Sequence, residues 1–145
     1  MPKQNIKSAE EEYLYQAWHI ETNIASCINE MNAIRLKLYS VPISSYGNVV
    51  RGINPVNTTE DYISDLIEYE DKLKVLISEY SRLKKEIQEI IERVPNMRER
   101  TVLRLRFIER MSFNDIGIAM SYSKSQVFEF YDQAIKNVKI PQSSE

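Results

Sequence analysis

Six arginines between residues 93 and 110 are the side chains with the clearest chemical potential in this sequence. Only Glu99 and Glu109 offset their charge, although the full chain of 145 residues has a formal net charge of −2. A guanidinium group binds phosphate oxygens, and local charge governs contact with a nucleic-acid backbone. A solvated, ion-paired helix surface is the alternative. We expect phosphate contacts from the arginines that can share one helix face, which are Arg100, Arg104 and Arg106.

A helix-turn-helix pattern follows this basic stretch. Ser123 is a suitable N-cap for a final helix, and Gly117 in the preceding helix permits a close crossing of the two. Ser121 stands in the turn, at a position that needs a residue tolerant of positive φ. The first turn of the final helix would enter the major groove of DNA. The expected interface residues are Tyr122, Ser123, Lys124, Ser125, Gln126 and Phe128.

Catalysis and metal binding find little support in the residue types. His19 and Cys27 are the only histidine and the only cysteine, whereas a metal site needs several converging ligands. Cys27 lies among apolar positions that favour core packing, and the sequence has no glycine-rich phosphate loop. We therefore expect no catalytic residues, no metal and no cofactor, and a protein that is not an enzyme.

Four motifs of the C-terminal stretch carry a family resemblance. PNMRERTVLRLRF, SFNDIG, YSKSQV and the pair Ala134 and Ile135 together resemble region 4 of the sigma-70 family. The whole chain, with SSYGNVVRG between its long helices, resembles small phage regulators of the RinA/ArpU kind. The resemblance implies a phage or prophage transcriptional regulator that binds double-stranded DNA, with host RNA polymerase as a further partner.

Two positions depart from the sigma pattern. Lys124 matches a basic residue that the family uses at the DNA, but Ser125 replaces an acid and Phe128 replaces an arginine. The DNA sequence preference of that family is therefore not expected here. Phe128 and Tyr131 also exceed the apolar surface that two short helices can cover. They pack on the preceding helices, meet a partner, or contact a thymine methyl group.

Two long helices are predicted before this module. From Tyr13 to Leu38, apolar residues recur at alternating spacings of four and three, which is the seam of a supercoiling helix over residues 6–39. A second helix of this kind begins at Thr58 or Thr59 and ends near Pro95. Three short helices follow it, over residues 96–109, 113–120 and 124–138.

Residues 40–59 cannot continue either long helix, because they include Pro42, Gly47, Gly52 and Pro55. A mobile tether and a loop with a short strand at 48–50 both remain possible. The predicted fold class is all-α, with a long antiparallel, coiled-coil-like hairpin followed by a three-helix helix-turn-helix module. The expected domains are an arm over 1–94 with loop 40–59, the module over 95–140, and a tail over 141–145.

The second long helix has more apolar surface than one partner helix covers. Ile63, Ile67, Ile77 and Ile91 widen its stripe, and a single hairpin makes a thin core. We expect a homodimer or a larger homo-oligomer, against the alternative of packing within one chain. The expected oligomerisation residues are Leu66, Leu73, Leu76, Tyr80, Leu83 and Ile87.

The sequence predicts a cytoplasmic protein that does not associate with membranes. Its first residues lack the apolar core of a signal peptide, no apolar run approaches the ~18 residues that span a bilayer, and one cysteine allows no internal disulfide. Two alternatives to a regulator remain. One is small-terminase-like recognition of a DNA packaging site. The other is a protein-binding adaptor or inhibitor that keeps the motif as a scaffold, favoured by Phe128, Glu129, Tyr131 and Asp132.

Overall fold

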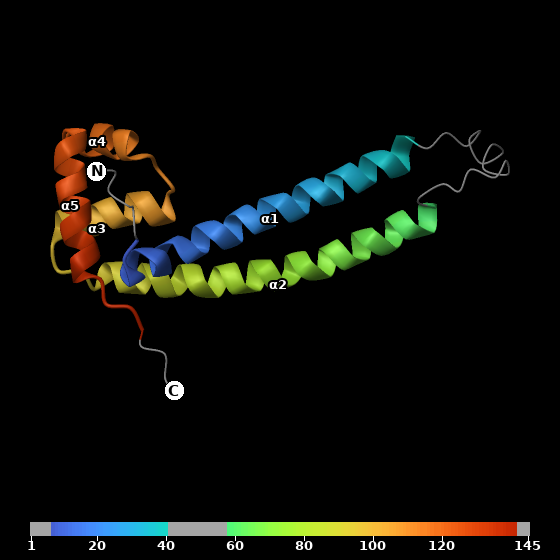
Figure 1. The fold of residues 1–145 in the computed structure, drawn as a ribbon, viewed down its shortest axis with the longest axis horizontal. Coiled ribbons are helices and arrows are strands. Elements are labelled where there is room, and N and C mark those ends of the chain that lie inside the picture. The colour runs from blue at the N-terminus through green and yellow to red at the C-terminus, as the bar shows by residue number, and fades with distance from the viewer. Residues whose placement is uncertain (1–6, 41–57, 142–145) are drawn as a thin grey trace, which may run out of the picture. The chain divides into compact units, whose positions relative to one another are not determined.

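The computed structural model describes residues 7–40 and 58–141, and these parts of the chain are helical and all-α as predicted (Figure 1). The predicted strand at 48–50 and nearly all of loop 40–59 lie outside the described residues. The two long helices and the three short segments fall within a few residues of their predicted limits. The elements are α1 (Ala9–Ser40), α2 (Thr59–Glu92), α3 (Met97–Leu103), the π-helical turn η2 (Arg104–Ile108), α4 (Phe113–Met120) and α5 (Lys124–Asn137).

The described chain divides into two compact units whose limits differ from the predicted boundary at residue 95. One unit combines residues 7–20 with 80–141, and the other comprises residues 21–40 with 58–79. The beginning of α1 and the end of α2 therefore belong to the same unit as the three C-terminal helical segments. Short helices bury too little apolar surface alone, so turns of both long helices complete their core.

The core of the first unit explains this recruitment. Its largest fully buried side chains come from every helix of the unit. Each such aliphatic side chain contributes roughly 1.5–3 kcal/mol when it leaves water, so removal of the α1 or α2 contribution would leave the remaining core open. These side chains are Leu14, Ile87, Val94, Val102, Leu103, Ile116 and Val127.

Three serines determine where α4 begins and ends and where α5 begins. Ser112 caps α4 through a hydrogen bond from the backbone N–H of Asp115 to its Oγ. Ser121 ends α4 in the left-handed region, with φ 60° and ψ 41°. Ser123 caps α5 and forms a capping box with Gln126. The N-caps and the left-handed turn are as predicted from the sequence.

Gly117 lies where the turn crosses back over α4. A Cβ atom at this position would lie 2.8 Å from the carbonyl oxygen of Tyr122, 3.7 Å from the side chain of Val127 and 3.8 Å from the backbone nitrogen of Lys124. The first neighbour is a backbone atom, so it cannot move aside by a rotamer change. The close crossing predicted from this glycine is therefore present.

In the second unit, α1 and α2 run antiparallel (Figure 1). The Cys27 thiol donates a hydrogen bond to the Tyr69 carbonyl over 3.3 Å, and Asn23 lines a cavity of about 540 Å³ with Val75 and Leu76. Buried Cys27, Met31 and Ile34 belong to the predicted seam of α1. At the start of α2, the Asp61 carboxylate accepts a hydrogen bond from the Thr58 N–H, which lowers the pKa of Asp61. The Asp61 N–H in turn donates to the Thr58 hydroxyl.

We expect Gly117→Ala to destabilise the protein by about 1–3 kcal/mol, because the added methyl group meets backbone. Alanine in place of glycine within an ordinary helix would instead stabilise it by roughly 0.5–1 kcal/mol. Urea unfolding followed by circular dichroism measures the difference. Asn114→Ala, at an exposed position of the same helix, is the control. A variant at 117 as stable as the parent would disprove the close crossing.

Candidate nucleic-acid interface

The first turn of α5 has two exposed side chains outside the cap and two that are occupied by the cap. The ammonium group of Lys124 lies 5.9 Å from the centre of the Phe128 ring. Lys124 and Ser125 are exposed. Ser123 and Gln126 are also exposed, but the Ser123 N–H donates to Gln126 Oε1 over 3.3 Å and the Gln126 N–H donates to Ser123 Oγ over 3.2 Å. Of the four polar residues predicted here, Lys124 and Ser125 are therefore the two that can turn toward a ligand at no cost to the helix.

The two aromatic residues predicted for the interface lie differently. The half-buried Tyr122 ring packs edge-on against Phe130 at 5.0 Å and lies 5.6 Å from the Arg98 guanidinium. The Phe128 ring packs on Phe113 at 4.6 Å and keeps 38% of its surface exposed. Tyr122 thus serves mainly to pack the turn, whereas Phe128 has one face available.

Tyr131 is the aromatic residue of α5 that neighbouring segments bury. It is buried, its ring contacts Phe113 at 4.9 Å and Phe107 at 6.1 Å, and its hydroxyl donates a hydrogen bond to Glu11 of α1. Burial, and then this hydrogen bond, raise the pKa of Tyr131, so the phenol stays protonated and remains the donor. The module packs on the preceding helices, which is one of the three possibilities that the sequence left open.

Arg106 does not share a face with Arg100 and Arg104, contrary to the sequence expectation. Its guanidinium donates to the Tyr15 hydroxyl over 3.1 Å and to the Met111 carbonyl over 2.9 Å. It also lies over the Phe113 ring at 4.1 Å and the Trp18 ring at 4.6 Å. The π-helical turn η2 contains this residue and changes the register of the side chains after Leu103. Arg106 is therefore an internal clamp.

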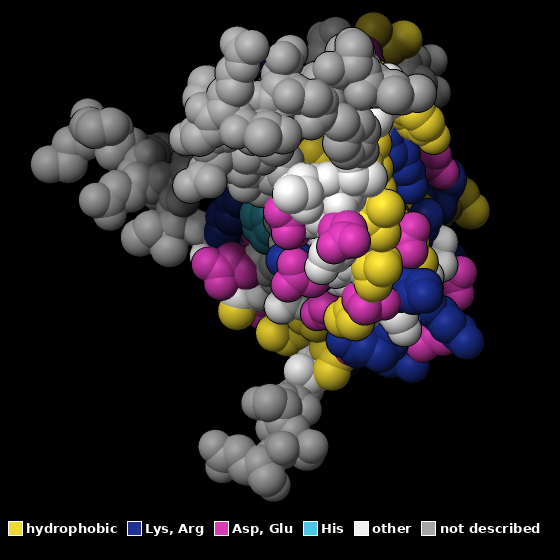
Figure 2. Space-filling view, turned by 90° about the vertical axis from the view of Figure 1, so that its right-hand side faces the viewer, with side chains coloured by type: hydrophobic (Ala, Val, Ile, Leu, Met, Phe, Trp, Pro, Cys, Tyr) yellow, Lys and Arg dark blue, Asp and Glu magenta, His cyan; other side chains and the backbone are white. Residues whose placement is uncertain are grey.

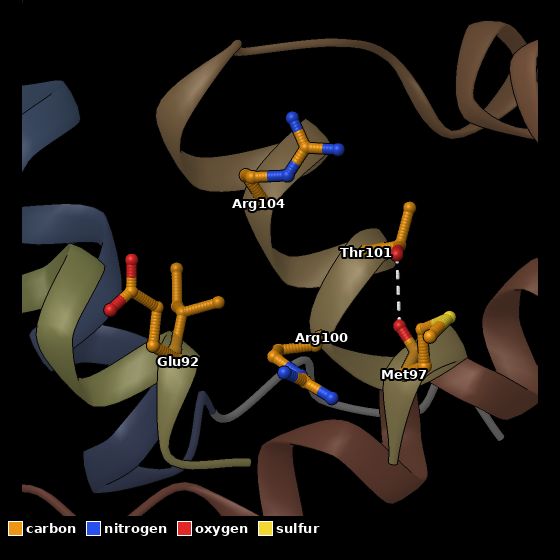
Figure 3. A pocket seen from close by; sticks show the side chains of 6 residues that line it. Glu92, Met97, Arg100, Thr101 and Arg104 are labelled. Carbon is orange, nitrogen blue, oxygen red and sulfur yellow. Dashed lines mark hydrogen bonds between the residues drawn. The ribbon is translucent and has the colours of Figure 1, made fainter. Parts of the chain in front are cut away.

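Arg100 and Arg104 line one small cavity of about 210 Å³ with Glu92 and Met97 (Figure 3). Thr101 lines it too, with its hydroxyl held by the Met97 carbonyl over 2.8 Å. Arg104 is exposed, and the Nε atom of Arg100 is buried with no hydrogen-bond partner among the described residues. A buried N–H without a partner is costly, but this atom is closed off from solvent, so Arg104 is the exposed arginine of the pair.

A buried acid fastens the opposite end of α5. Glu99 is 7% exposed and accepts a hydrogen bond of 2.6 Å from the Asn137 side chain. From the sequence, Glu99 counts only as an acid that offsets neighbouring arginines. Its partner Asn137 lies 38 residues away in the sequence, and no local pattern predicts this contact. The same is true of Glu11, which lies in a polar run at the beginning of α1.

The residues predicted for oligomerisation pack within a single chain. Leu83 and Ile87 are buried in the core of the first unit, and Tyr80 packs against that core. Leu66, Leu73 and Leu76 are half-buried on α2 in the second unit. Leu83 and Ile87 therefore face the core of their own chain, so a second copy of the chain would have to use residues other than these two.

Neither a metal site nor a membrane span is found within the described ranges 7–40 and 58–141. They contain no group of three His, Cys, Asp or Glu side chains placed to hold a metal ion. None of their helices combines the length and the apolar character needed to cross a bilayer.

Arg106→Ala should destabilise the protein by about 2 kcal/mol, because it removes the hydrogen bonds to Tyr15 and Met111 and the contacts with aromatic rings. Arg106→Lys should restore less than half of this loss, since an ammonium group lacks the planar fork. Arg104→Ala should change stability by no more than about 0.5 kcal/mol. Urea midpoints of the three variants test the clamp, and equal midpoints for the two alanine variants would refute it.

No curated protein and no solved structure matches this chain. One family model does, under the description "Protein of unknown function (DUF1492)", and it matches residues 40–139. The match begins at the last residue of α1 and extends beyond the end of α5, so it covers both the basic cavity and the first turn of α5. Since this is more than half of the sequence, the chain belongs to the DUF1492 family.

Proposed function

We propose that this protein is a transcriptional regulator of phage or prophage origin that binds duplex DNA through a sigma region 4-like helix-turn-helix in the host cytoplasm. The observation that carries the proposal is the geometry of α4, the turn and α5. A left-handed Ser121, the close crossing at Gly117 and the capped start at Ser123 are the features that such a motif requires.

The start of α5 suits a DNA backbone and a base edge together. The first backbone N–H groups of a helix lack intrahelical acceptors, and the helix dipole favours phosphate at this end. Lys124 adds a flexible cation and Ser125 a short hydroxyl at the exposed first turn. We assign base contacts to these two side chains. Phe128 offers an apolar face that suits a thymine methyl group.

The cavity at Arg100 and Arg104 supplies a second point of contact. The helix before a helix-turn-helix crosses the DNA backbone, and phosphate contacts position a protein without reading its sequence. We assign this role to Arg104, which is exposed, and to Arg100, which is half-buried beside it. Arg106 has no part in it, because its hydrogen bonds and ring contacts are internal.

Lys124→Ala combined with Ser125→Ala should reduce the preference for specific over random DNA at least about tenfold, since base contacts carry discrimination of about 1–3 kcal/mol each. Sites are first isolated by selection of bound fragments from the genome that encodes the protein, with excess competitor DNA. Gel-shift titration of one recovered site against random DNA then gives the preference.

Lys136→Ala is the matched control, because it removes the same charge from an exposed position in the last turn of α5. It should leave the preference within about twofold of the parent. An unchanged preference in the double variant would refute the assignment of the first turn as the recognition surface. Recovery of no fragment at any salt concentration would refute DNA binding itself.

Arg104→Ala should weaken binding to specific and random DNA equally and lower the slope of log K against log salt by about 0.9, which is the value for one lost phosphate contact. Titrations at several salt concentrations measure the slope. The thermal midpoint should not change, in contrast with Arg106→Ala. A slope equal to that of the parent would show that Arg104 does not meet phosphate.

A second candidate function is binding to a polypeptide, such as host RNA polymerase. It is favoured by exposed apolar side chains on α4 and α5, since Ile118 is 72% exposed and Phe128 38%. Glu129 and Asp132 are also exposed on α5, and an acidic surface repels DNA. Both functions can coexist, because Ile118 lies on α4 and the two acids follow the first turn of α5.

A further inference from the structure

In the second unit, α1 and α2 meet along a contact row of buried and half-buried residues, which includes Cys27, Leu66, Leu73 and Leu76. An apolar flank lies beside this contact row. On α2, Ile63, Ile67 and Ile77 are 47%, 55% and 46% exposed. Isoleucine is rarely left this open at several positions on one face of a helix. On the face that Figure 2 draws, hydrophobic side chains likewise reach the surface among acidic and basic ones.

Helix α1 adds to the same flank. Ile77 directly follows the contact residue Leu76, and Ile28, which is 41% exposed, directly follows the contact residue Cys27. In an antiparallel pair, the residues that follow the contact row on each helix lie on the same side. Both helices therefore present isoleucine there.

The opposite flank is polar. The residues that directly precede the contact row are Asn23, Asp65, Lys72 and Glu79. Val75 is the large apolar residue that this side exposes in the described part of α2, and it lies by the cavity that Asn23 lines. The difference between the flanks indicates that one of them is built to be covered.

We propose that the apolar flank binds a second copy of this chain, with the two α2 helices antiparallel. The exposed isoleucines of α2 lie in one row with two charged residues. The row has spacings of 4, 3, 4 and 3 and consists of Ile63, Ile67, Glu70, Lys74 and Ile77. This is a second heptad row. A twofold axis at Lys72 places Ile67 opposite Ile77 of the other copy, and Glu70 opposite its Lys74. Each pair then forms twice, as a closed dimer requires.

The two charges determine the orientation. A parallel pair in register would place Glu70 against Glu70 and Lys74 against Lys74, and like charges at an interface are strongly unfavourable. Only the antiparallel pair brings opposite charges together. Within the described residues the ion pair present joins Arg82 to Glu86, so neither Glu70 nor Lys74 is engaged in it. This inference does not depend on DNA binding, and its test requires no DNA.

Sedimentation equilibrium of the full chain should give twice the chain mass of 17.1 kDa. Glu70→Lys and Lys74→Glu should each raise the dissociation constant at least about tenfold, and the double exchange should return it to within about threefold of the parent. Val75→Glu on the polar flank is the control and should leave it unchanged. A monomer at all concentrations, a larger ring, or failure of the double exchange would overturn the proposal.

Cross-linking tests the orientation independently. In a Cys27→Ser background, Ile67→Cys together with Ile77→Cys should yield a disulfide-linked dimer under mild oxidation, because the antiparallel pair brings these positions within disulfide reach. Ile67→Cys alone should yield none. Efficient cross-linking of that single variant would indicate a parallel pair and refute the arrangement. Circular dichroism verifies that each variant keeps its helical content.

Discussion

The packing of α5 on the first turns of α1 is the contact on which the first unit depends. Tyr131 reaches Glu11, Phe107 lies between the rings of Tyr15 and Tyr131, and Arg106 joins Tyr15 to the residues after η2. The family match starts at residue 40, yet Leu14 and Ala17 are almost completely buried in this core. Residues outside the matched region are thus part of the support of the proposed recognition helix.

The orientation of α5 follows from a few backbone constraints. A left-handed residue reverses the chain, a glycine lets the turn approach α4, and a capping box fixes the first turn. At the far end, Glu99 holds Asn137. A helix fixed at both ends presents its exposed first turn without the entropy cost of ordering it on binding. This arrangement favours recognition by a small number of side chains.

Charge is divided between helices in a way that suits the proposed function. The exposed surface of α5 carries Glu129 and Asp132 beside Lys124 and Lys136, so this helix alone attracts DNA weakly. Arg104 on the neighbouring turn supplies positive charge that the acids of α5 do not offset. Non-specific attraction and sequence recognition would then rest on different elements. A dimer through the apolar flank of α2 would strengthen both by presenting two modules together.

The sequence by itself determined the helices, their caps, the turn at Ser121 and the need for glycine at 117, because each depends on neighbours within a few residues. It also indicated that α5 had more aromatic surface than α3 and α4 could cover. The tertiary structure decided which apolar and charged residues face inward. The sequence places Arg106 among the arginines expected at phosphate, and Glu99 and Glu11 among the solvated charges. Each of the three has a partner at least five residues away, and most of these partners are far more distant. Leu83 and Ile87 fit an oligomer seam by spacing and are buried within one chain instead. Periodicity reports that a helix face is apolar, but what covers that face depends on how distant segments fold back on it.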